Sequence, residues 1–371
     1  MTSAKEIVTD LLNAADIQIN GSRPQDIKIH DDRLYSRVLS GGSLALGESY
    51  MDGWWDANSL DEFFYYLLNA DLDVKVVGLK NMVVPYLKAK FLNRQKTHSH
   101  HIGEWHYDIG NELYSKMLDK NMQYSCAYWK NAKNLNQAQV DKMDLICRKL
   151  QLKKGETLLD IGCGWGGLLK YAAQKYGVIG VGITVSKEQA SYARTDCEGL
   201  PVEIRIEDYR KTSGQFDKIV SVGMIEHVGF KNYDDYMSVA HRCLKDDGIF
   251  LLHTIGSNTT SRGAGDAWTD KYIFPDGKIP SIAQLARASE KLFIIEDWHN
   301  FGAYYDKTLI AWRENFIKAW PTLKDKYDEK FYRMWTYYLS SCAGGFRARK
   351  IQLWQIVLTK KGILGGYKRT D

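Results

Sequence analysis

The chain has 371 residues, is 44% hydrophobic and 26% charged, and carries a formal net charge of +5. This composition excludes a collagen-like, low-complexity or disordered chain, and no window approaches the roughly 18 unbroken apolar residues of a membrane-spanning helix. Glu6 and Asp10 interrupt the first apolar pattern, so we expect no secretory signal. The six cysteines form no C-x-x-C pair, which indicates reduced thiols in a cytoplasmic protein.

Residues 1–95 predict a smaller, mainly helical N-terminal domain. A helix is expected over 4–15, short β-like runs over 17–20 and 27–30, and a second helix over 59–70. Ser59 and Glu62 stand at the spacing of a capping box for that helix.

Two segments are strongly basic. Residues 74–96 hold six Lys or Arg and no acid, with helical apolar spacing interrupted by Pro85, and 343–371 hold seven basic residues against Asp371. Two such segments favour an anionic partner, although each alone could be a solvated surface. We expect 96–105 to be a linker, whose HSHH cluster (His98, His100, His101) fits a solvated polar segment better than a metal site.

From about residue 150 strands and helices alternate. Strands are expected at 157–162, 178–184, 202–206, 216–223 and 248–256, with helices at 167–176, 186–197 and 233–244. A helix–strand pair follows at 281–298, helices at 304–341, and a last edge strand at 351–360. Crossover helices between strands predict a parallel, doubly wound, Rossmann-like α/β sheet that binds ligands at the carboxyl ends of its strands.

A glycine-rich loop follows the first of these strands. Gly162, Gly164, Gly166 and Gly167 suit either a dinucleotide or S-adenosylmethionine. Asp160 stands where a carboxylate can accept from the ammonium group of S-adenosylmethionine. The next strand ends in Thr184 without the acid that a dinucleotide site needs, while Gln189 can reach a ribose. Glu207 and Asp208 offer acceptors for an adenine amino group, so the pattern favours S-adenosylmethionine over NAD.

Several segments resemble the bacterial cyclopropane-fatty-acyl-phospholipid synthases and their relatives that modify mycolic acids. They are YDIGNELYSKMLDKNMQYSCAYW, LLDIGCGWGG, SVGMIEHVG, LLHTIG, EDWHNFGAYYDKTL and CAGGFRARKIQLWQ. The resemblance covers 106–371, which we expect to be one S-adenosylmethionine-dependent catalytic domain. SRVLSGGSLALGESYMDGWW extends it to the N-terminal domain and points to the phospholipid-modifying branch.

The resemblance implies methylene transfer from S-adenosylmethionine to a cis double bond of a phospholipid acyl chain, giving a cyclopropane ring and S-adenosylhomocysteine. It implies a bound bicarbonate ion as general base, held by Cys126, Glu226, His253, the main chain of Ile255, and Tyr305. It carries cofactor contacts to Tyr124, Ser125, 159–167, 184–189, Glu207 and Asp208, and it marks Cys342 as an active-site cysteine. It also favours a homodimer.

The chemistry is consistent with such a pocket. An alkene is a weak nucleophile, and the cation formed by methyl transfer must lose a proton where water cannot quench it. Glu226 and His253 stand at predicted strand ends, whereas His227 is expected to face away. Cys126 alone would be a buried apolar residue, and Cys342 suits a structural role because methylene transfer needs no covalent enzyme intermediate.

The sequence alone is compatible with two other functions. One is methyl or methylene addition to a lipid double bond without ring closure, and another is a non-catalytic protein that binds lipid or nucleic acid and senses S-adenosylmethionine. We favour an enzyme that acts at an anionic membrane surface as a peripheral protein and does not bind nucleic acid. The apolar face of 74–96 either inserts shallowly into the interface or packs within the protein.

Overall fold

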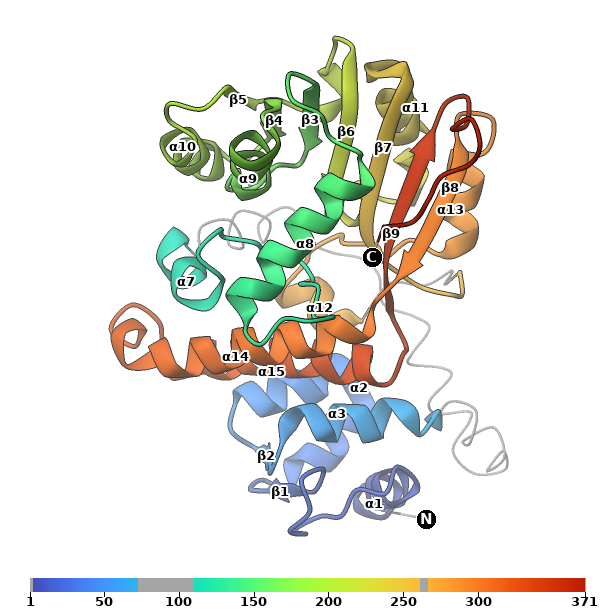
Figure 1. Ribbon diagram of the computed structural model, residues 1–371. Coiled ribbons are helices and arrows are strands. Elements are labelled where there is room, and N and C mark those ends of the chain that lie inside the picture. The colour runs from blue at the N-terminus through green and yellow to red at the C-terminus, as the bar shows by residue number, and fades with distance from the viewer. Residues whose placement is uncertain (1–2, 73–109, 261–265, 371) are drawn as a thin grey trace. The chain divides into compact units, whose positions relative to one another are not determined.

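The computed structural model describes residues 3–72, 110–260 and 266–370, which form two compact units (Figure 1). The first unit combines the described part of 1–109 with the described part of 264–276 and with 309–350. The second contains 110–263, 277–308 and 351–371 in their described parts. The expected catalytic region 106–371 therefore contributes to both units. The basic segment 74–96 and the expected linker 96–105 lie outside the described residues.

The first unit is mainly helical. Its helices and strands are α1 Ala4–Ala14, β1 Ile27–Ile29, α2 Arg33–Met51, β2 Trp55–Ala57, α3 Leu60–Asn69, α12 Ala267–Tyr272 and α15 Glu329–Arg347, and it includes most of α14 Ala303–Leu323. The ring of Tyr337 on α15 lies 5.5 Å from Tyr50, 4.9 Å from Phe64 and 4.4 Å from Trp268, between ring centroids. These aromatic contacts unite helices that are distant in sequence.

The expected capping box at the start of α3 is absent. Ser59 is the N-cap residue, but its side chain makes no capping hydrogen bond to the backbone. Its hydroxyl instead donates to Asp61 Oδ1 at 3.0 Å. Asp61 also accepts from Arg313 Nη1 at 2.7 Å and Arg347 Nη2 at 2.8 Å, so the serine joins a buried ionic cluster.

The second unit is built on a seven-stranded sheet with the order β5-β4-β3-β6-β7-β9-β8. The strands are β3 Thr157–Ile161, β4 Ile179–Thr184, β5 Val202–Ile206, β6 Phe216–Val222, β7 Leu244–Gly256, β8 Ile294–Asn300 and β9 Gln352–Thr359. The pairs among β3 to β7 are parallel, as expected, whereas β9 is antiparallel to both β7 and β8. The sheet is therefore mixed. The expectation that 351–360 forms an edge strand is wrong, because β9 lies inside the sheet and β8 is at its edge.

Helices cover both faces of this sheet. The helices that pack on it are α8 Leu135–Lys149, α9 Gly167–Tyr176, α10 Lys187–Asp196, α11 Tyr233–Cys243 and α13 Ile282–Ser289. The unit also contains α7 Gly110–Met117 and the short 3-10 helices η1 Tyr209–Lys211, η2 Ile225–His227 and η3 Phe230–Asn232. One buried cluster packs α11 and α13 on the sheet, and the other packs α8, α9 and α10 on it. Leu158 and Leu159 enter opposite clusters, as do Leu251 and Leu252. Burial on both faces explains why these strands are continuous apolar runs.

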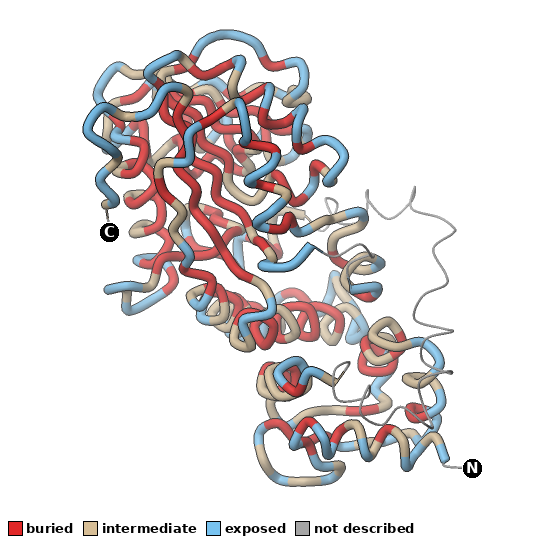
Figure 2. The backbone as a smooth tube through the Cα atoms, turned by 90° about the vertical axis from the view of Figure 1, so that its right-hand side faces the viewer, coloured by how far each residue is buried: buried red, intermediate tan, exposed pale blue. Residues whose placement is uncertain are grey.

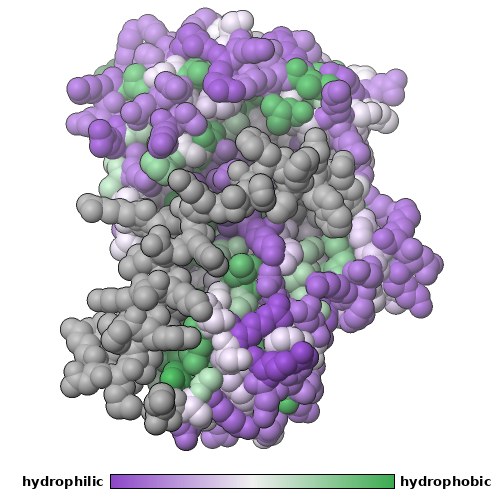
Figure 3. Space-filling view, turned by 180° about the vertical axis from the view of Figure 1, so that it is seen from behind, coloured by the Kyte–Doolittle hydropathy of each residue, from purple (hydrophilic) through white to green (hydrophobic). Residues whose placement is uncertain are grey.

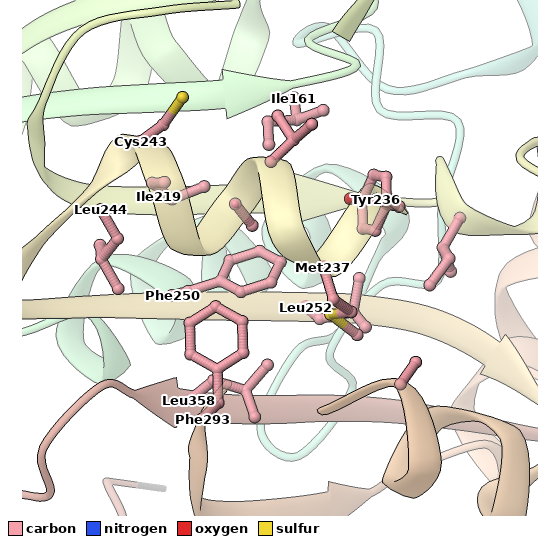
Figure 4. Close-up of a cluster of buried hydrophobic side chains, with 14 of the residues drawn as sticks. Ile161, Ile219, Tyr236, Met237, Cys243, Leu244, Phe250, Leu252, Phe293 and Leu358 are labelled. Carbon is pink, nitrogen blue, oxygen red and sulfur yellow. The ribbon is translucent and has the colours of Figure 1, made fainter. Parts of the chain in front are cut away.

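Figure 4 shows the first of these clusters, where Tyr236 and Met237 of α11 lie over Phe250 and Leu252 of β7. The buried residues follow the strands of the sheet in Figure 2. On the face drawn in Figure 3, hydrophilic residues predominate and hydrophobic residues form small separate groups. Within the described ranges, every helix is too short or too polar to cross a membrane.

Candidate active site

The glycine loop lies between β3 and α9, at the carboxyl end of β3. Gly162, Gly164 and Gly166 have φ of +88°, +54° and +81°, in the left-handed region that favours glycine. A Cβ at Gly164 would meet nothing within 4 Å, so this position opens onto free space. A Cβ at Gly167 would lie 2.1 Å from the carbonyl oxygen of Asn121, so this glycine is needed for packing against 121–123.

Asp160, near the end of β3, is a buried carboxylate with an unsatisfied oxygen. Its residue is 2% exposed, and Oδ1 has no hydrogen-bond partner among the described residues. Burial raises the pKa of Asp160 to about 7, although the charge of Lys142 opposes this shift. A buried carboxylate without a partner is costly, and a ligand that supplies an ammonium group would remove that cost.

The segment that carries Tyr124 and Ser125 is held against α8. Lys142 Nζ donates to Gln123 Oε1 at 2.7 Å and to Ser125 Oγ at 2.8 Å. Gln139, one helical turn earlier, donates from Nε2 to the carbonyl oxygen of Ser125 at 2.9 Å. The ring of Tyr124 lies 5.1 Å from that of Tyr114.

The polar residues after β4 and β5 interact mainly with one another and with their own loops. Thr184 Oγ1 lies 3.1 Å from Gln189 Oε1. Glu207 Oε1 accepts from the Thr212 hydroxyl at 2.7 Å. Asp208 accepts from the Arg210 backbone and guanidinium, and this hydrogen bonding lowers the pKa of Asp208 to about 2.

Glu226 and β7 form a second group of buried polar atoms. The Ile255 backbone N–H donates to Glu226 Oε1 at 2.7 Å, whereas Oε2 has no hydrogen-bond partner in the described parts of the chain. Burial raises the pKa of Glu226 to about 7, against the opposing effect of the Ile255 N–H. Glu226 lies in η2 and not at the end of a strand, so alternation along a strand does not decide the direction of His227.

His253, two residues before Ile255 on β7, is 1% exposed. Burial and the charges of Lys142 and Lys149 hold the pKa of His253 well below its ordinary value, so the ring is neutral near pH 7. Its Nδ1 lies 3.3 Å from Gln355 Nε2 of β9, and its Nε2 has no partner within the described ranges. Glu226 and His253 therefore both present unsatisfied buried atoms.

Cys126 and Tyr305 lie in segments joined by Thr308. The Ala127 N–H donates to Thr308 Oγ1 at 3.1 Å, and that hydroxyl donates to the Tyr304 carbonyl oxygen at 2.9 Å. Cys126 is fully buried, and burial raises the pKa of its thiol, so it remains a neutral thiol. The charge of Lys142 acts on Cys126, Asp160 and His253 alike.

Cys342 belongs to the first unit, on α15, whereas the other expected site residues all belong to the second unit. Burial raises the pKa of the Cys342 thiol to about 12. Such a thiol is protonated at neutral pH and is a poor nucleophile.

Sequence reasoning did not single out Lys142, Gln139, Gln355 or Thr308. Gln139 and Lys142 could have been found from their spacing, because residues three apart in a helix share a face and this face is buried. For metals, the described ranges hold no cluster of three or more His, Cys, Asp or Glu that could bind an ion.

Comparisons with known proteins identify related chains. A family model described as "Mycolic acid cyclopropane synthetase" matches residues 93–356. The cyclopropane-fatty-acyl-phospholipid synthase of Escherichia coli (strain K12) is 54% identical over 363 residues, which cover 98% of this chain and 94% of that protein. Two solved structures match 72% of this chain and 100% of theirs at 31% identity. They are the cyclopropane synthase MmaA2 from Mycobacterium tuberculosis (TM-score 0.66) and the mycolic acid cyclopropane synthase CmaA1 complexed with SAH and CTAB (TM-score 0.65).

Proposed function

This chain belongs to the mycolic acid cyclopropane synthetase family, and on that premise we propose that it transfers a methylene group from S-adenosylmethionine to the cis double bond of an acyl chain in a membrane phospholipid. One observation carries the choice of phospholipid. The match to the E. coli phospholipid enzyme spans 98% of this chain, including the N-terminal helices, whereas the two mycolic acid enzymes match 72%.

The residues of the second unit fit S-adenosylmethionine. The unsatisfied Asp160 oxygen suits its ammonium group, and the open space at Gly164 suits a close approach of ligand to backbone. Tyr124, Ser125, Thr184 and Gln189 complete the proposed contacts, with Glu207 and Asp208 as acceptors for adenine. When bound, the sulfonium supplies an activated methyl group.

The proposed reaction first forms a carbocation on the acyl chain and then removes a proton from it. The alkene carbon forms a bond to the methyl carbon, the sulfur–methyl bond breaks, and the acyl chain is left as a cation. The added methyl then loses a proton, and the ring closes. Glu226, with a pKa of about 7, is suited to hold a proton near neutral pH, and its burial keeps water away.

We propose that bicarbonate binds between Glu226 and His253. The unsatisfied Glu226 Oε2 and His253 Nε2, with the Ile255 main chain, Cys126 and Tyr305, are the proposed ligands. Bicarbonate would accept the proton, so His253 need not be charged. Protonated Glu226 can donate to such an anion, so a raised pKa favours binding. Cys342 has no step in this proposal.

The test uses vesicles of an unsaturated phospholipid with S-adenosylmethionine. We expect S-adenosylhomocysteine to form, and each modified acyl chain to gain the mass of one CH2 group with loss of its double bond. Methyl addition without ring closure would give the same gain of one CH2 group but retain a double bond, and two further hydrogens would appear only after reduction of that bond by an added reductant. Such a product would indicate a lipid C-methyltransferase. Lack of turnover, with S-adenosylmethionine bound, would favour a sensing role and contradict the proposal.

We also propose a homodimer that docks on anionic membrane surfaces. The proposal is based on 74–96, because five of the seven basic residues in 343–371 form ion pairs within the protein. Arg347 pairs with Asp61 and Glu62, Lys350 with Asp71, Lys360 and Lys361 with Asp246, and Arg369 with Asp297. Such engaged charges contribute little attraction to a distant surface.

Vesicle sedimentation tests this docking. Reversal of Lys75, Lys80, Lys88 and Lys90 to Glu should lower activity on anionic vesicles and leave cofactor affinity unchanged. Binding of the wild type should weaken with salt, because each basic residue near an anionic surface contributes about 1 kcal/mol within a Debye length. Salt-independent binding, or full activity of the reversed variant, would contradict the proposal. Sedimentation velocity tests the dimer.

A further inference from the structure

Lys142 is a buried lysine with hydrogen-bond partners that packing alone does not require. It lies on α8, is fully buried, and is flanked on its helix by the apolar residues Met143 and Ile146. Burying an ammonium group is expensive unless charged or polar partners compensate for it. An apolar side chain would fill this position at lower cost, so the charge of Lys142 calls for an explanation.

The ammonium group fixes one particular segment. It donates to side-chain oxygens of Gln123 and Ser125, at 2.7 and 2.8 Å. Gln139 on the same helix face donates to the backbone carbonyls of the same two residues, at 3.2 and 2.9 Å. Residues 123–125 are therefore held by both backbone and side chain, and Tyr124 between them has little freedom to turn.

Charged and titratable groups face Lys142 from several elements. Burial lowers the pKa of Lys142 to about 8, and Asp119 after α7, Cys126 and Asp160 of β3 act in the opposite direction. Lys142 in turn lowers the pKa of Asp160, and together with Lys149 that of His253. Lys142 is thus a buried positive charge acting on Asp160, whose Oδ1 has no partner among the described residues.

We infer that Lys142 is a positioning residue of the cofactor site, which holds Gln123 and Ser125 by hydrogen bonds and supplies a buried positive charge that favours the carboxylate form of Asp160, the form that can receive the cofactor's ammonium group. The inference rests on the proposed function, because it takes the ligand of the glycine loop to be S-adenosylmethionine. Lys142 itself need not touch the ligand. Its contribution is the charge and orientation of groups that do.

The experiment compares two ligands that differ in the ammonium group. S-adenosylhomocysteine carries an amino acid, whereas 5′-methylthioadenosine has the same nucleoside and thioether sulfur without it. In the full-length variant Lys142→Met, calorimetry at pH 7 should show S-adenosylhomocysteine bound at least about fivefold more weakly, as expected if loss of the charge lets burial raise the pKa of Asp160 further and the ionised fraction falls from about one half to about one tenth. The affinity for 5′-methylthioadenosine should change less than about threefold.

The pH profile gives the second readout. Affinity for S-adenosylhomocysteine should rise with pH as Asp160 ionises, and the midpoint should be higher in Lys142→Met than in the wild type. Lys142→Gln, which removes the charge and keeps a donor, should show the same shift and serves if the methionine variant does not fold. Lys133→Met, at an exposed lysine before α8, is the matched control and should behave as wild type.

Equal loss of affinity for both ligands, or an unmoved midpoint, would overturn the inference and make Lys142 a packing residue. Unchanged affinity for S-adenosylhomocysteine would overturn it as well. In either case the proposed function would stand, because the wild type would bind the ligand. Failure of the wild type to bind S-adenosylhomocysteine would instead overturn the proposed function and this inference with it.

Discussion

One buried carboxylate of the first unit and two of the second have opposite surroundings. In the first unit, Asp61 accepts hydrogen bonds from two arginines and from Ser59. Burial opposes its ionisation, but the hydrogen bonds and charges of Arg313 and Arg347 outweigh burial and hold the pKa of Asp61 below its ordinary value. In the second unit, Asp160 and Glu226 each retain an oxygen without a partner among the described residues, and burial raises the pKa of both to about 7.

The contrast distinguishes a carboxylate that stabilises the fold from the two that we propose to be functional. A carboxylate whose hydrogen bonds are all supplied by the protein stabilises the fold and has little to offer a ligand. One that is buried and incompletely paired costs stability, and it is poised to bind an ion or hold a proton. Substitution of Asp61 should therefore lower the free energy of unfolding. Substitution of Glu226 should instead lower the turnover rate without lowering the free energy of unfolding.

The largest effect is expected on the stability of the first unit. Asp61→Asn leaves Arg313 and Arg347 facing a neutral group and should destabilise the protein by about 3 kcal/mol, as expected when one partner of a buried ion pair is removed. Thermal unfolding followed by circular dichroism measures the change. Asp246→Asn, which removes an exposed ion-pair partner, should leave the unfolding temperature almost unchanged. Equal effects of the two variants would contradict the assignment.

The next effect is expected on turnover and not on stability. Glu226→Gln and His253→Ala should lower S-adenosylhomocysteine formation on vesicles by about 10²-fold or more, with cofactor affinity largely retained. Glu226→Gln should unfold at the same temperature as the wild type or higher, because it removes a buried carboxylate with an unsatisfied oxygen. Glu198→Gln, at an exposed glutamate, is the control for activity. Near-normal turnover in both pocket variants would place the base elsewhere.

A third effect concerns the pH dependence of stability. The folded-state pKa of Asp160 is raised to about 7 from 3.8, so the folded protein binds more protons than the unfolded chain between these values. Without ligand, Asp160 should therefore lower the free energy of unfolding as pH rises from about 4 to 7, by up to roughly 1.4 kcal/mol per pH unit. The slope should become less negative in Asp160→Asn, as measured by denaturant unfolding at several pH values.

Asp61 has the opposite sign. Its folded-state pKa is lowered, so its contribution is present above the ordinary value near 4 and is lost as pH falls through the folded-state value. In acid titrations, the free energy of unfolding of the wild type should exceed that of Asp61→Asn at every pH above about 4, and the difference should shrink only as pH falls below that value. A loss of the difference already near pH 6 would contradict the sign.

The smallest effect compares two serines at helix starts. Ser281 forms a complete capping box with Gln284 at the start of α13, so Ser281→Ala should cost about 1 kcal/mol. Ser59 makes no such cap, so the cost of Ser59→Ala should reflect only its hydrogen bond to Asp61. In the Asp61→Ala background, which removes the side-chain acceptor of the Ser59 hydroxyl, the two serine substitutions should therefore differ most. Equal costs in that background would indicate that Ser59 caps α3 in solution.

Local patterns in the sequence predict much of the second unit. The β3–loop–α9 unit, the parallel strands up to β7 and the helix–strand pair α13–β8 follow from apolar runs, glycines and periodicity. The position of β9 does not, because an apolar run identifies a strand without identifying its neighbours. The same applies to α15, whose partners α2 and α3 come from a distant part of the sequence.

The candidate site shows the same limit. Spacing singled out Asp160 and the glycines, whereas the roles proposed for Glu226 and His253 came from the family resemblance and from their expected place at strand ends. Lys142 has no motif, because its role depends on partners that only folding brings to α8. Ser59 had the spacing of a cap, yet its hydroxyl donates to Asp61 two residues later, which also accepts hydrogen bonds from the distant Arg313 and Arg347.

The insertion of β9 between β7 and β8 also bears on when the pocket forms during synthesis. His253 on β7 is paired with Gln355 on β9, 102 residues later in the chain. At about 5–20 residues per second, a ribosome needs roughly 5–20 s to add those residues. During that interval β7 lacks its antiparallel neighbour and the histidine lacks its amide contact, so a nascent chain can present its glycine loop well before it can catalyse a reaction.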